Sequence, residues 1–237
     1  MVPVSQILIP ADEPQRLQSI RQYNVMHSLQ EPVFGEFVSL TARIFSLPIS
    51  LIALVDETQV QYTASFGLPN IATQAREEAL CSTAILSNKA IVYTDLATDT
   101  SPLITRQAAA AARAHALRFY AAACIRTPDE RRIGSLCVID HQPRLFSVDE
   151  QQLLEQIATL VSQMVAVRHC CFVSPVLGPA QWEQIREQFQ EELQALAALV
   201  RYLITRHGTQ VPISQDMLTL VSRRLDDLRE LLDEYES

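Results

Sequence analysis

The chain carries five cysteine thiols, the side chains with the most versatile chemistry in its sequence. A thiol with a lowered pKa can act as a nucleophile or form a reversible disulfide, and a thiolate can bind zinc. The number is odd, all five lie in apolar segments, and no CxxC pair or spaced Cys and His set accompanies them. We therefore expect neither a secreted disulfide framework nor a metal site. The five are Cys81, Cys124, Cys137, Cys170 and Cys171.

Two carboxylates, Asp95 and Asp99, stand close together in the segment DLATDTSP. Paired carboxylates can do general acid and base work. In a segment of Thr, Ser and Pro, however, aspartates more often accept hydrogen bonds from their own backbone. We expect the structural role for this pair.

Three aromatic residues, Tyr62, Phe119 and Tyr120, lie in apolar runs that favour strands. If the alternation of a strand points them inward, they can line a small-molecule pocket, and core packing explains them equally well. No Ser/His/Asp set, phosphate-binding loop or metal signature stands elsewhere in the sequence. We therefore expect a protein that is not an enzyme.

The bulk composition describes a globular chain with no affinity for nucleic acid. Its 237 residues are 48% hydrophobic and 19% charged, with a formal net charge of -8 and a pI near 5.1. Binding to phosphates needs clustered Lys and Arg, and the nearest approach is Arg131 with Arg132, which we interpret as a solvated pair in a turn. No apolar run reaches the length of a membrane span and the N-terminus lacks the features of a signal peptide, so we expect no membrane contact and a cytoplasmic protein.

The elements that must position these side chains follow from periodicity and turn chemistry. Asp12 is expected to cap a first helix, and a second helix must stop before Pro48. Two β-hairpins follow from apolar, β-branched runs on either side of turns, and an Ala-rich stretch between them favours a helix. The expected ranges are helices at 13–22 and 37–45, a hairpin of 49–56 with 60–67, helical character at 77–87, a strand at 90–93, a helix at 103–116 and a second hairpin around Pro128.

A long helix and a helical hairpin close the chain. Ser147 with Glu150 forms a capping box before an apolar helix that ends near His169. We place a first domain at 1–173, a linker at 174–178 and the hairpin at 179–237. The apolar stripes of the hairpin repeat every seven residues, which favours a homodimer through a four-helix bundle. The alternative is that the hairpin packs back on its own first domain. The expected interface residues are Phe189, Leu193, Leu196, Val200, Val221, Leu225 and Leu228.

This order of elements gives an α+β fold, with a central antiparallel sheet flanked by helices and followed by an α-helical hairpin. Over about residues 16–169 the chain resembles bacterial GAF domains. RLQSIRQYNV and FGEFVSLTARIFSLPISLIALVDETQVQYTASFGLP are similar to the entry helices and first hairpin of that family. Cys81 with Ser82 and Ala84 resembles the start of the family's cysteine-containing helix. Asp95 with Asp99 resembles the family's acidic loop. LRFYAAA and GSLCVIDHQPRLFSVDE resemble its later strands and its closing helix.

The resemblance implies a pocket on one face of the sheet, used by family members for cyclic nucleotides, tetrapyrroles, haem or small metabolites, or left empty as an interaction surface. The residues that we place at this pocket are Tyr62, Cys81, Asp95, Phe119, Tyr120 and Cys137. Cys81 and Cys137, which match the family pattern, are expected to be buried, although either could be a redox-sensitive thiol. The identity of any cofactor stays open. A covalent bilin is not expected, because the family's light sensors attach it to a cysteine followed by histidine and this chain has no such pair.

Two functions remain in view: a regulatory protein that binds a small ligand and signals through a helical dimer, and a ligand-free scaffold that recruits another protein. A third, less favoured hypothesis is a cysteine-dependent reductase similar to the free methionine sulfoxide reductases of this fold, with Cys124 approaching Cys137 across the second hairpin. The hairpin also resembles the dimerisation hairpin of histidine kinases. His207 lacks the surrounding motif of their phosphoacceptor, so we expect a contact surface there.

Overall fold

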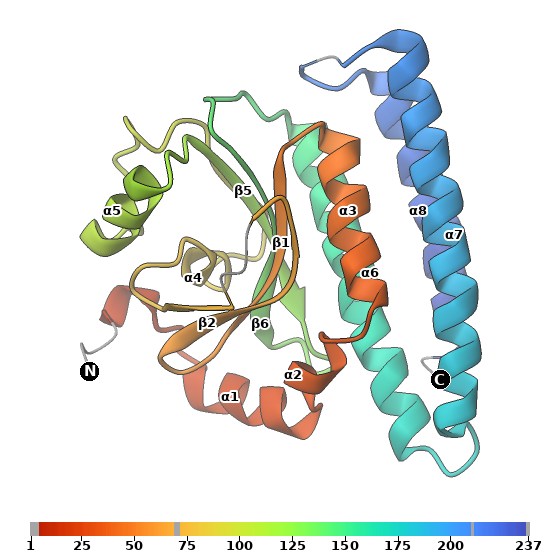
Figure 1. Ribbon diagram of the computed structural model, residues 1–237. Coiled ribbons are helices and arrows are strands. Elements are labelled where there is room, and N and C mark those ends of the chain that lie inside the picture. Colours follow the sequence, from red (N-terminus) through yellow and green to blue (C-terminus); the bar gives the residue numbers. More distant parts are fainter. Residues whose placement is uncertain (1–4, 69–71, 210, 236–237) are drawn as a thin grey trace.

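The computed structural model describes residues 5–68, 72–209 and 211–235 and contains one antiparallel sheet in the order β3-β2-β1-β6-β5-β4 (Figure 1). The two hairpins expected from the sequence are present and form the centre of this sheet. They join through β1 and β6, which pair from Ile49 with Ile139 to Leu54 with Gly134. The strands are β1 (Ile49–Val55), β2 (Gln59–Phe66), β3 (Thr73–Ala75), β4 (Ile91–Tyr93), β5 (Phe119–Arg126) and β6 (Arg132–Asp140).

Helices cover both faces of the sheet, which explains why β1 is buried along its whole length. On one face lie α3 and α6, and on the other α4 and α5 (Figure 1). Gly134 allows the close approach of β6 to β1, since a Cβ atom there would collide with the carbonyl oxygen of Ala53. The helices are η1 (Gln6–Leu8), α1 (Glu13–Gln22), α2 (Val25–Ser28), α3 (Val33–Phe45), α4 (Cys81–Ala84), α5 (Arg106–Ala114), α6 (Val148–Val173), α7 (Gly178–His207) and α8 (Gln215–Asp233).

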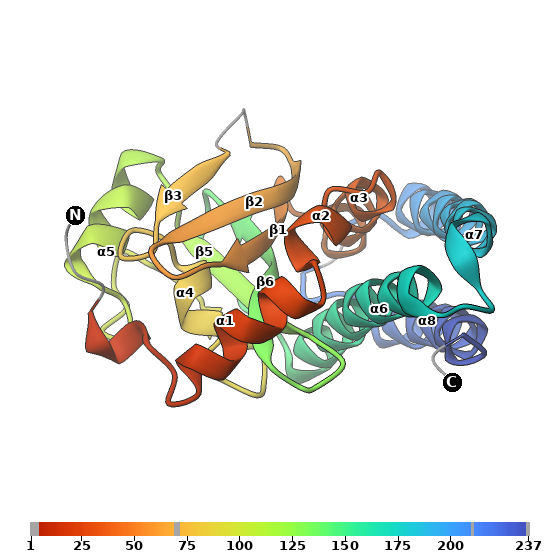
Figure 2. The ribbon, with the colours of Figure 1, turned by 90° about the horizontal axis from the view of Figure 1, so that it is seen from below.

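The helical hairpin, α7 with α8, packs on α3 and α6 of the same chain. Figure 2 shows α3 and α6 between the sheet and the hairpin. The seven residues expected at a homodimer interface are at most 4% exposed and belong to the large core cluster that also contains Phe37 and Leu160. Within one chain these residues are therefore covered by α3 and α6, and their role in an interface between chains stays a prediction.

The seven-residue periodicity predicts that one face of each hairpin helix is buried, but it does not determine which surface covers that face. The apolar faces of α3 and α6, left uncovered by the sheet, supply two helices of the expected four-helix bundle from within the chain. The homodimer itself stays a prediction, and so do the domain boundaries. The hairpin does share one continuous hydrophobic core with residues of α3 and α6.

Local boundaries differ from the sequence expectations where tertiary contacts compete with propensity. Helical character expected at 77–87 is confined to α4, and the Ala-rich helix begins at Arg106, where the Thr105 hydroxyl accepts a hydrogen bond from the amide of Ala108. The capping box of Ser147 and Glu150 is present. The short β3 and α2 carry no periodic signal and were not expected.

Asp12 precedes α1 but does not cap it with its side chain. Its carboxylate instead pairs with Arg131 at 2.9 Å and with Arg132 at 3.8 Å. Long-range ion pairing thus competes with the local capping that the sequence indicated, and the two arginines are not the freely solvated pair that we expected. These contacts attach α1 to the turn between β5 and β6.

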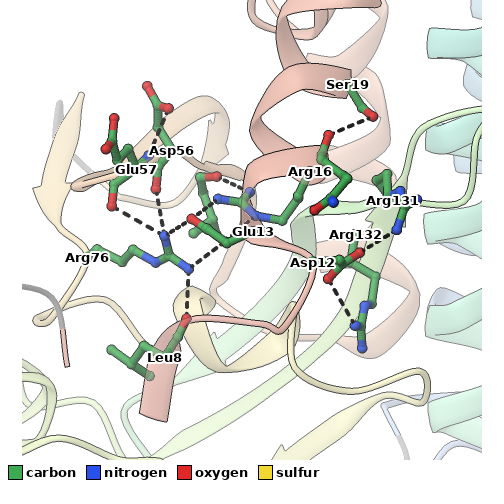
Figure 3. Close-up of polar contacts among 12 residues, drawn as sticks. Leu8, Asp12, Glu13, Arg16, Ser19, Asp56, Glu57, Arg76, Arg131 and Arg132 are labelled. Carbon is green, nitrogen blue, oxygen red and sulfur yellow. Dashed lines mark hydrogen bonds and ion pairs between the residues drawn. The ribbon is translucent and has the colours of Figure 1, made fainter. Parts of the chain in front are cut away.

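A buried ionic cluster attaches the N-terminal segment to the sheet (Figure 3). The Glu13 carboxylate accepts two hydrogen bonds from Arg16, each 2.8 Å long, and also pairs with Arg76. Arg76 further donates to the carbonyl oxygens of Leu8 and Asp56. Both guanidinium groups are almost completely buried, and a single carboxylate is the counter-ion that they share.

A second buried carboxylate, Glu150, connects three parts of the chain. Its side chain is fully buried and accepts from Arg144 at 2.8 Å, from the amide of Ser147 at 2.7 Å and from the amide of Ile213 at 3.3 Å. Arg144 also donates to the carbonyl oxygen of Phe45 at the end of α3. Glu150 therefore links the start of α6, the end of α3 and the segment before α8.

One described helix, α6, is long and apolar enough to cross a membrane by length and composition alone. Most of the residues in its apolar window are buried inside the protein, against the sheet and the neighbouring helices. A helix at the core of a globular domain has the same properties. Its composition is therefore accounted for by the core.

Candidate functional site

A small cavity lies over the face of the sheet that α4 and α5 cover. Its volume is about 50 Å³, enough for a few water-sized molecules. Helix α5 forms one wall through its alanines and α4 another through its first residue, and strands β1, β2, β5 and β6 provide the floor. The lining residues are Leu51, Tyr62, Leu68, Gln74, Glu78, Leu80, Cys81, Ala108, Ala111, Ala112, His115, Leu117, Tyr120 and Ile139.

Four of the six residues that the sequence placed at a pocket lie at or beside this cavity. Tyr62, Cys81 and Tyr120 line it. Cys137 is fully buried directly behind Cys81, with 4.0 Å between their sulfur atoms. Strand alternation explains the set, because Tyr120 on β5 and Cys137 on β6 both face the smaller core cluster between the sheet and α4.

The other two residues lie elsewhere, and their assignment to the pocket needs correction. Phe119 precedes Tyr120 on β5, so its side chain points to the opposite face, where its ring packs 5.5 Å from that of Phe146. Adjacent residues of a strand cannot both face one pocket. Asp95 lies outside the cavity lining and forms a bidentate pair with Arg118 at 2.7 and 2.6 Å.

The turn of Asp95 and Asp99 has the structural role expected from its composition. Asp95 accepts from the amide of Ala97 and Asp99 from the amide of Ser101. The hydrogen bonds from Arg118 hold the pKa of the Asp95 carboxyl below its usual value. Each aspartate is committed to local contacts, so the two do not act together as an acid and base pair.

Polar groups at the cavity come from segments without a distinctive sequence signal. Gln74, Glu78 and His115 line it, and the Tyr62 hydroxyl donates to Oε1 of Gln74 at 2.6 Å. Gln74 in turn donates to the carbonyl oxygen of Glu78 at 3.1 Å. These residues follow no motif that we recognise, so only the fold reveals them. The described lining residues include no Lys or Arg.

The thiols of Cys81 and Cys137 are in direct contact. The contact with Cys137 lowers the pKa of the Cys81 thiol against the opposing effect of burial, while burial raises the pKa of the Cys137 thiol. Cys81 is therefore the sulfur that loses its proton more easily, and Cys137 the one that keeps it. The hydroxyl groups of Tyr120 and Ser135 are buried close by, and both interact favourably with the Cys81 thiolate.

Cys124, the proposed partner of Cys137 in a reductase, is placed differently. It pairs with Ser135 across the hairpin, whereas Cys137 pairs with Ala122 and meets Cys81 instead. Burial raises the pKa of the Cys124 thiol to about 12. Its sulfur contacts the carbonyl oxygen of Ile125 at 3.4 Å. The described residues therefore do not form the Cys124 and Cys137 pair that such a reductase hypothesis requires.

Among the residues that the structure describes, no group of three His, Cys, Asp or Glu side chains could hold a metal ion.

Comparison with known families identifies the domain. The model of the GAF domain family matches residues 31–166, more than half of the chain. The chain belongs to the GAF domain family. The matched residues run from Glu31, two residues before α3, into α6 and contain all six strands, so the family covers the sheet, both of its faces and the cavity.

A curated relative corrects one expectation from the sequence. The GAF chain is 28% identical over 217 residues to a cyclic di-GMP phosphodiesterase of Pseudomonas aeruginosa, a match that covers 89% of this chain and 34% of that protein. The chain thus spans about a third of the relative's length. Because the relative is named as an enzyme, the expectation that the protein is not an enzyme is wrong.

Solved structures that are similar to this chain include two GAF domains. One, from a protein of Geobacter sulfurreducens, is 23% identical with a TM-score of 0.48, covering 62% of this chain and 98% of that one. The other, from an Acinetobacter phosphoenolpyruvate-protein phosphotransferase, is 16% identical with a TM-score of 0.48, covering 65% of this chain and 95% of that one.

Proposed function

We propose that this GAF domain is a cytoplasmic sensor that binds a small molecule in the cavity beneath α5 and signals through its helical layer. The observation that carries the proposal is the division of the protein into two cores by one sheet. The smaller core holds the cavity and the two thiols, and the larger core joins α3 and α6 to the hairpin. A change on one face can reach the other through β5, where Phe119 and Tyr120 face opposite cores.

The lining favours a neutral or cationic ligand with an apolar body. Its walls are mostly Leu, Ala and Tyr, and Glu78 contributes the only carboxylate among the described lining residues. Small-molecule sites combine such walls with a few polar groups, and phosphate groups call for Arg, Lys or a helix N-terminus. Cyclic di-GMP, which carries two phosphates, therefore fits this lining poorly.

We further propose that the module works in cyclic di-GMP signalling. The match to the Pseudomonas phosphodiesterase covers 89% of the chain, more than residues 1–178 can supply, so it extends into the hairpin. This coverage supports treating the GAF core and the hairpin as one module. A sensor of this kind would control phosphodiesterase activity by favouring one packing of the helices over another.

The cavity is smaller than the several hundred Å³ of a typical ligand site, so ligand entry requires α5 to move outward. This size also supports the alternative of a ligand-free scaffold. Filling the cavity separates the two functions. Ala112 is buried and lines the cavity, whereas Ala110 lies on the exposed side of the same helix, which makes Ala110→Leu a matched control.

We expect native mass spectrometry of the chain, after incubation with a bacterial metabolite extract, to show an added small-molecule mass. In Ala112→Leu the fraction of chains that carry this added mass should fall at least tenfold, because the new side chain occupies the cavity. In Ala110→Leu this fraction should stay as in the wild-type chain. If the wild-type chain carries no added mass, or if both variants retain it equally, the cavity is not the ligand site and the scaffold function is favoured.

The homodimer is retained as a proposal for the signalling unit. The seven stripe residues are buried within one chain, so a dimer formed through them requires the hairpin to leave α3 and α6 and pack on a second copy. Sedimentation equilibrium of the full chain tests the proposal. A mass twice that of one chain supports the dimer, and a single-chain mass over the whole concentration range contradicts it.

A further inference from the structure

We propose that Cys81 and Cys137 are a redox-sensitive pair that closes to a disulfide when a small hydroperoxide enters the cavity. The two residues are 56 positions apart in the sequence, one at the start of α4 and the other in the middle of β6. The fold brings their sulfur atoms to 4.0 Å within one buried cluster. The proposal does not depend on the identity of the ligand or on the link to cyclic di-GMP.

Access decides which oxidant can react. Cys81 is only 2% exposed, but its side chain lines the cavity, whereas Cys137 lies behind it and is not exposed at all. A cavity of about 50 Å³ admits molecules of the size of water or hydrogen peroxide and excludes bulky disulfides such as oxidised glutathione. Cys81 is therefore the thiol that meets the oxidant, and Cys137 is the thiol that resolves the product.

The chemistry balances with hydrogen peroxide as the two-electron oxidant. The Cys81 thiolate attacks one peroxide oxygen, an S–O bond forms as the O–O bond breaks, and the hydroxide released takes up a proton and leaves as water. The sulfur of Cys137 then attacks the sulfenic acid sulfur of Cys81. The S–S bond forms as the S–O bond breaks, and the departing hydroxide takes the proton of Cys137 and leaves as a second water.

The surroundings suit both steps. Cys137 keeps its proton in the resting pair and can hydrogen-bond to the Cys81 sulfur. The hydroxyls of Tyr120 and Ser135 have no other hydrogen-bond partner among the described residues and lie next to the pair, so they are available to stabilise the thiolate. Closing a contact of 4.0 Å to a bond of about 2 Å moves α4 toward β6 and changes the cavity wall.

Peptide mapping after oxidation tests the proposal. The folded chain is treated with hydrogen peroxide, free thiols are blocked with N-ethylmaleimide, and the digest is searched for the peptide of Cys81 linked to that of Cys137. We expect the linked pair in the wild-type chain, its release by dithiothreitol, and its complete loss in Cys81→Ser and in Cys137→Ser. Oxidised glutathione should yield at least tenfold less of it.

Cys124→Ser is the matched control, since Cys124 is a neighbouring strand cysteine outside the pair, and it should form the linked peptide to the same extent as the wild-type chain. Cys81→Ala provides a second variant if serine at that buried position impairs folding, which circular dichroism reports. The proposal is overturned if peroxide leaves Cys81 and Cys137 unlinked in the folded chain, or if glutathione disulfide links them as readily as peroxide does.

Discussion

Replacing Glu13 with alanine is expected to lower the free energy of unfolding by about 3–5 kcal/mol. The carboxylate is the partner of Arg16 and of Arg76, and both guanidinium groups are almost completely buried (Figure 3). The backbone carbonyls around them cannot neutralise their charges, so the variant leaves two buried cations without a counter-ion. Urea denaturation followed by circular dichroism measures the change.

Glu57→Ala is the control for this prediction. Glu57 lies in the same cluster but contributes only its backbone carbonyl oxygen to Arg76, while its side chain is exposed. Its replacement should change the unfolding free energy by no more than about 0.5 kcal/mol. Equal losses in the two variants would show that the Glu13 carboxylate does not hold the cluster together.

The same cluster predicts a pH dependence. Burial raises the pKa of Glu13, but the hydrogen bonds and charges of Arg16 and Arg76 outweigh it, so the pKa in the folded state lies below the ordinary value of 4.5. A carboxyl group with a depressed pKa adds stability that is fully present above about 4.5 and is lost as the pH falls through the folded-state pKa. Part of the acid destabilisation of the wild-type chain should therefore be missing in Glu13→Gln, as measured by urea denaturation between pH 3 and pH 6.

Glu150→Ala is the second variant with a large expected effect, also about 3–5 kcal/mol. Glu150 is completely buried and accepts hydrogen bonds from Arg144, from its own helix start and from Ile213. Its loss leaves the buried Arg144 without a counter-ion and frees the segment before α8. Hydrogen exchange should therefore increase in α8 more than in β1, in addition to the loss of stability.

The neighbouring Asp149→Ala provides the control for Glu150. Asp149 is exposed in the first turn of α6, where a carboxylate contributes about 0.3–1 kcal/mol through the helix dipole. It contacts neither Arg144 nor Ile213 in the hydrogen bonds that the structure shows. If α8 exchanges at the same rate in Glu150→Ala as in Asp149→Ala, the carboxylate does not couple the hairpin to the domain.

Periodic and local signals predicted most of the fold. The apolar runs of β1 and β6, the capping box of Ser147 and the seven-residue stripes of the hairpin all depend on residues that are close together in sequence. The partner of the stripes does not follow from such local signals, since Phe189 and Leu225 are buried in a core that they share with α3 and α6 of the same chain. Long-range pairing also decided the role of Asp12, which a capping pattern alone misassigned.

The candidate site was also predictable only in part, because local signals identify some of its residues and tertiary contacts bring in the others. Alternation and family resemblance placed Tyr62, Cys81 and Tyr120 at the cavity. Because adjacent strand residues point to opposite faces, Phe119 cannot line the cavity if Tyr120 does. This exclusion could have been made from the sequence. Glu78 and His115 reach the cavity only because the segment after β3 and the end of α5 lie beside it in the fold, and no local pattern predicts such a contact.

The proposed sensor requires the cavity and the helical hairpin to communicate through the sheet. Hydrogen exchange followed by mass spectrometry, comparing Ala112→Leu with Ala110→Leu, tests it most directly, because the first variant fills the cavity and the second leaves it unchanged. We expect altered exchange in α7 and α8 of Ala112→Leu, although both helices lie on the far side of the sheet. Identical exchange of α7 and α8 in the two variants, with changes confined to α4 and α5, would contradict it.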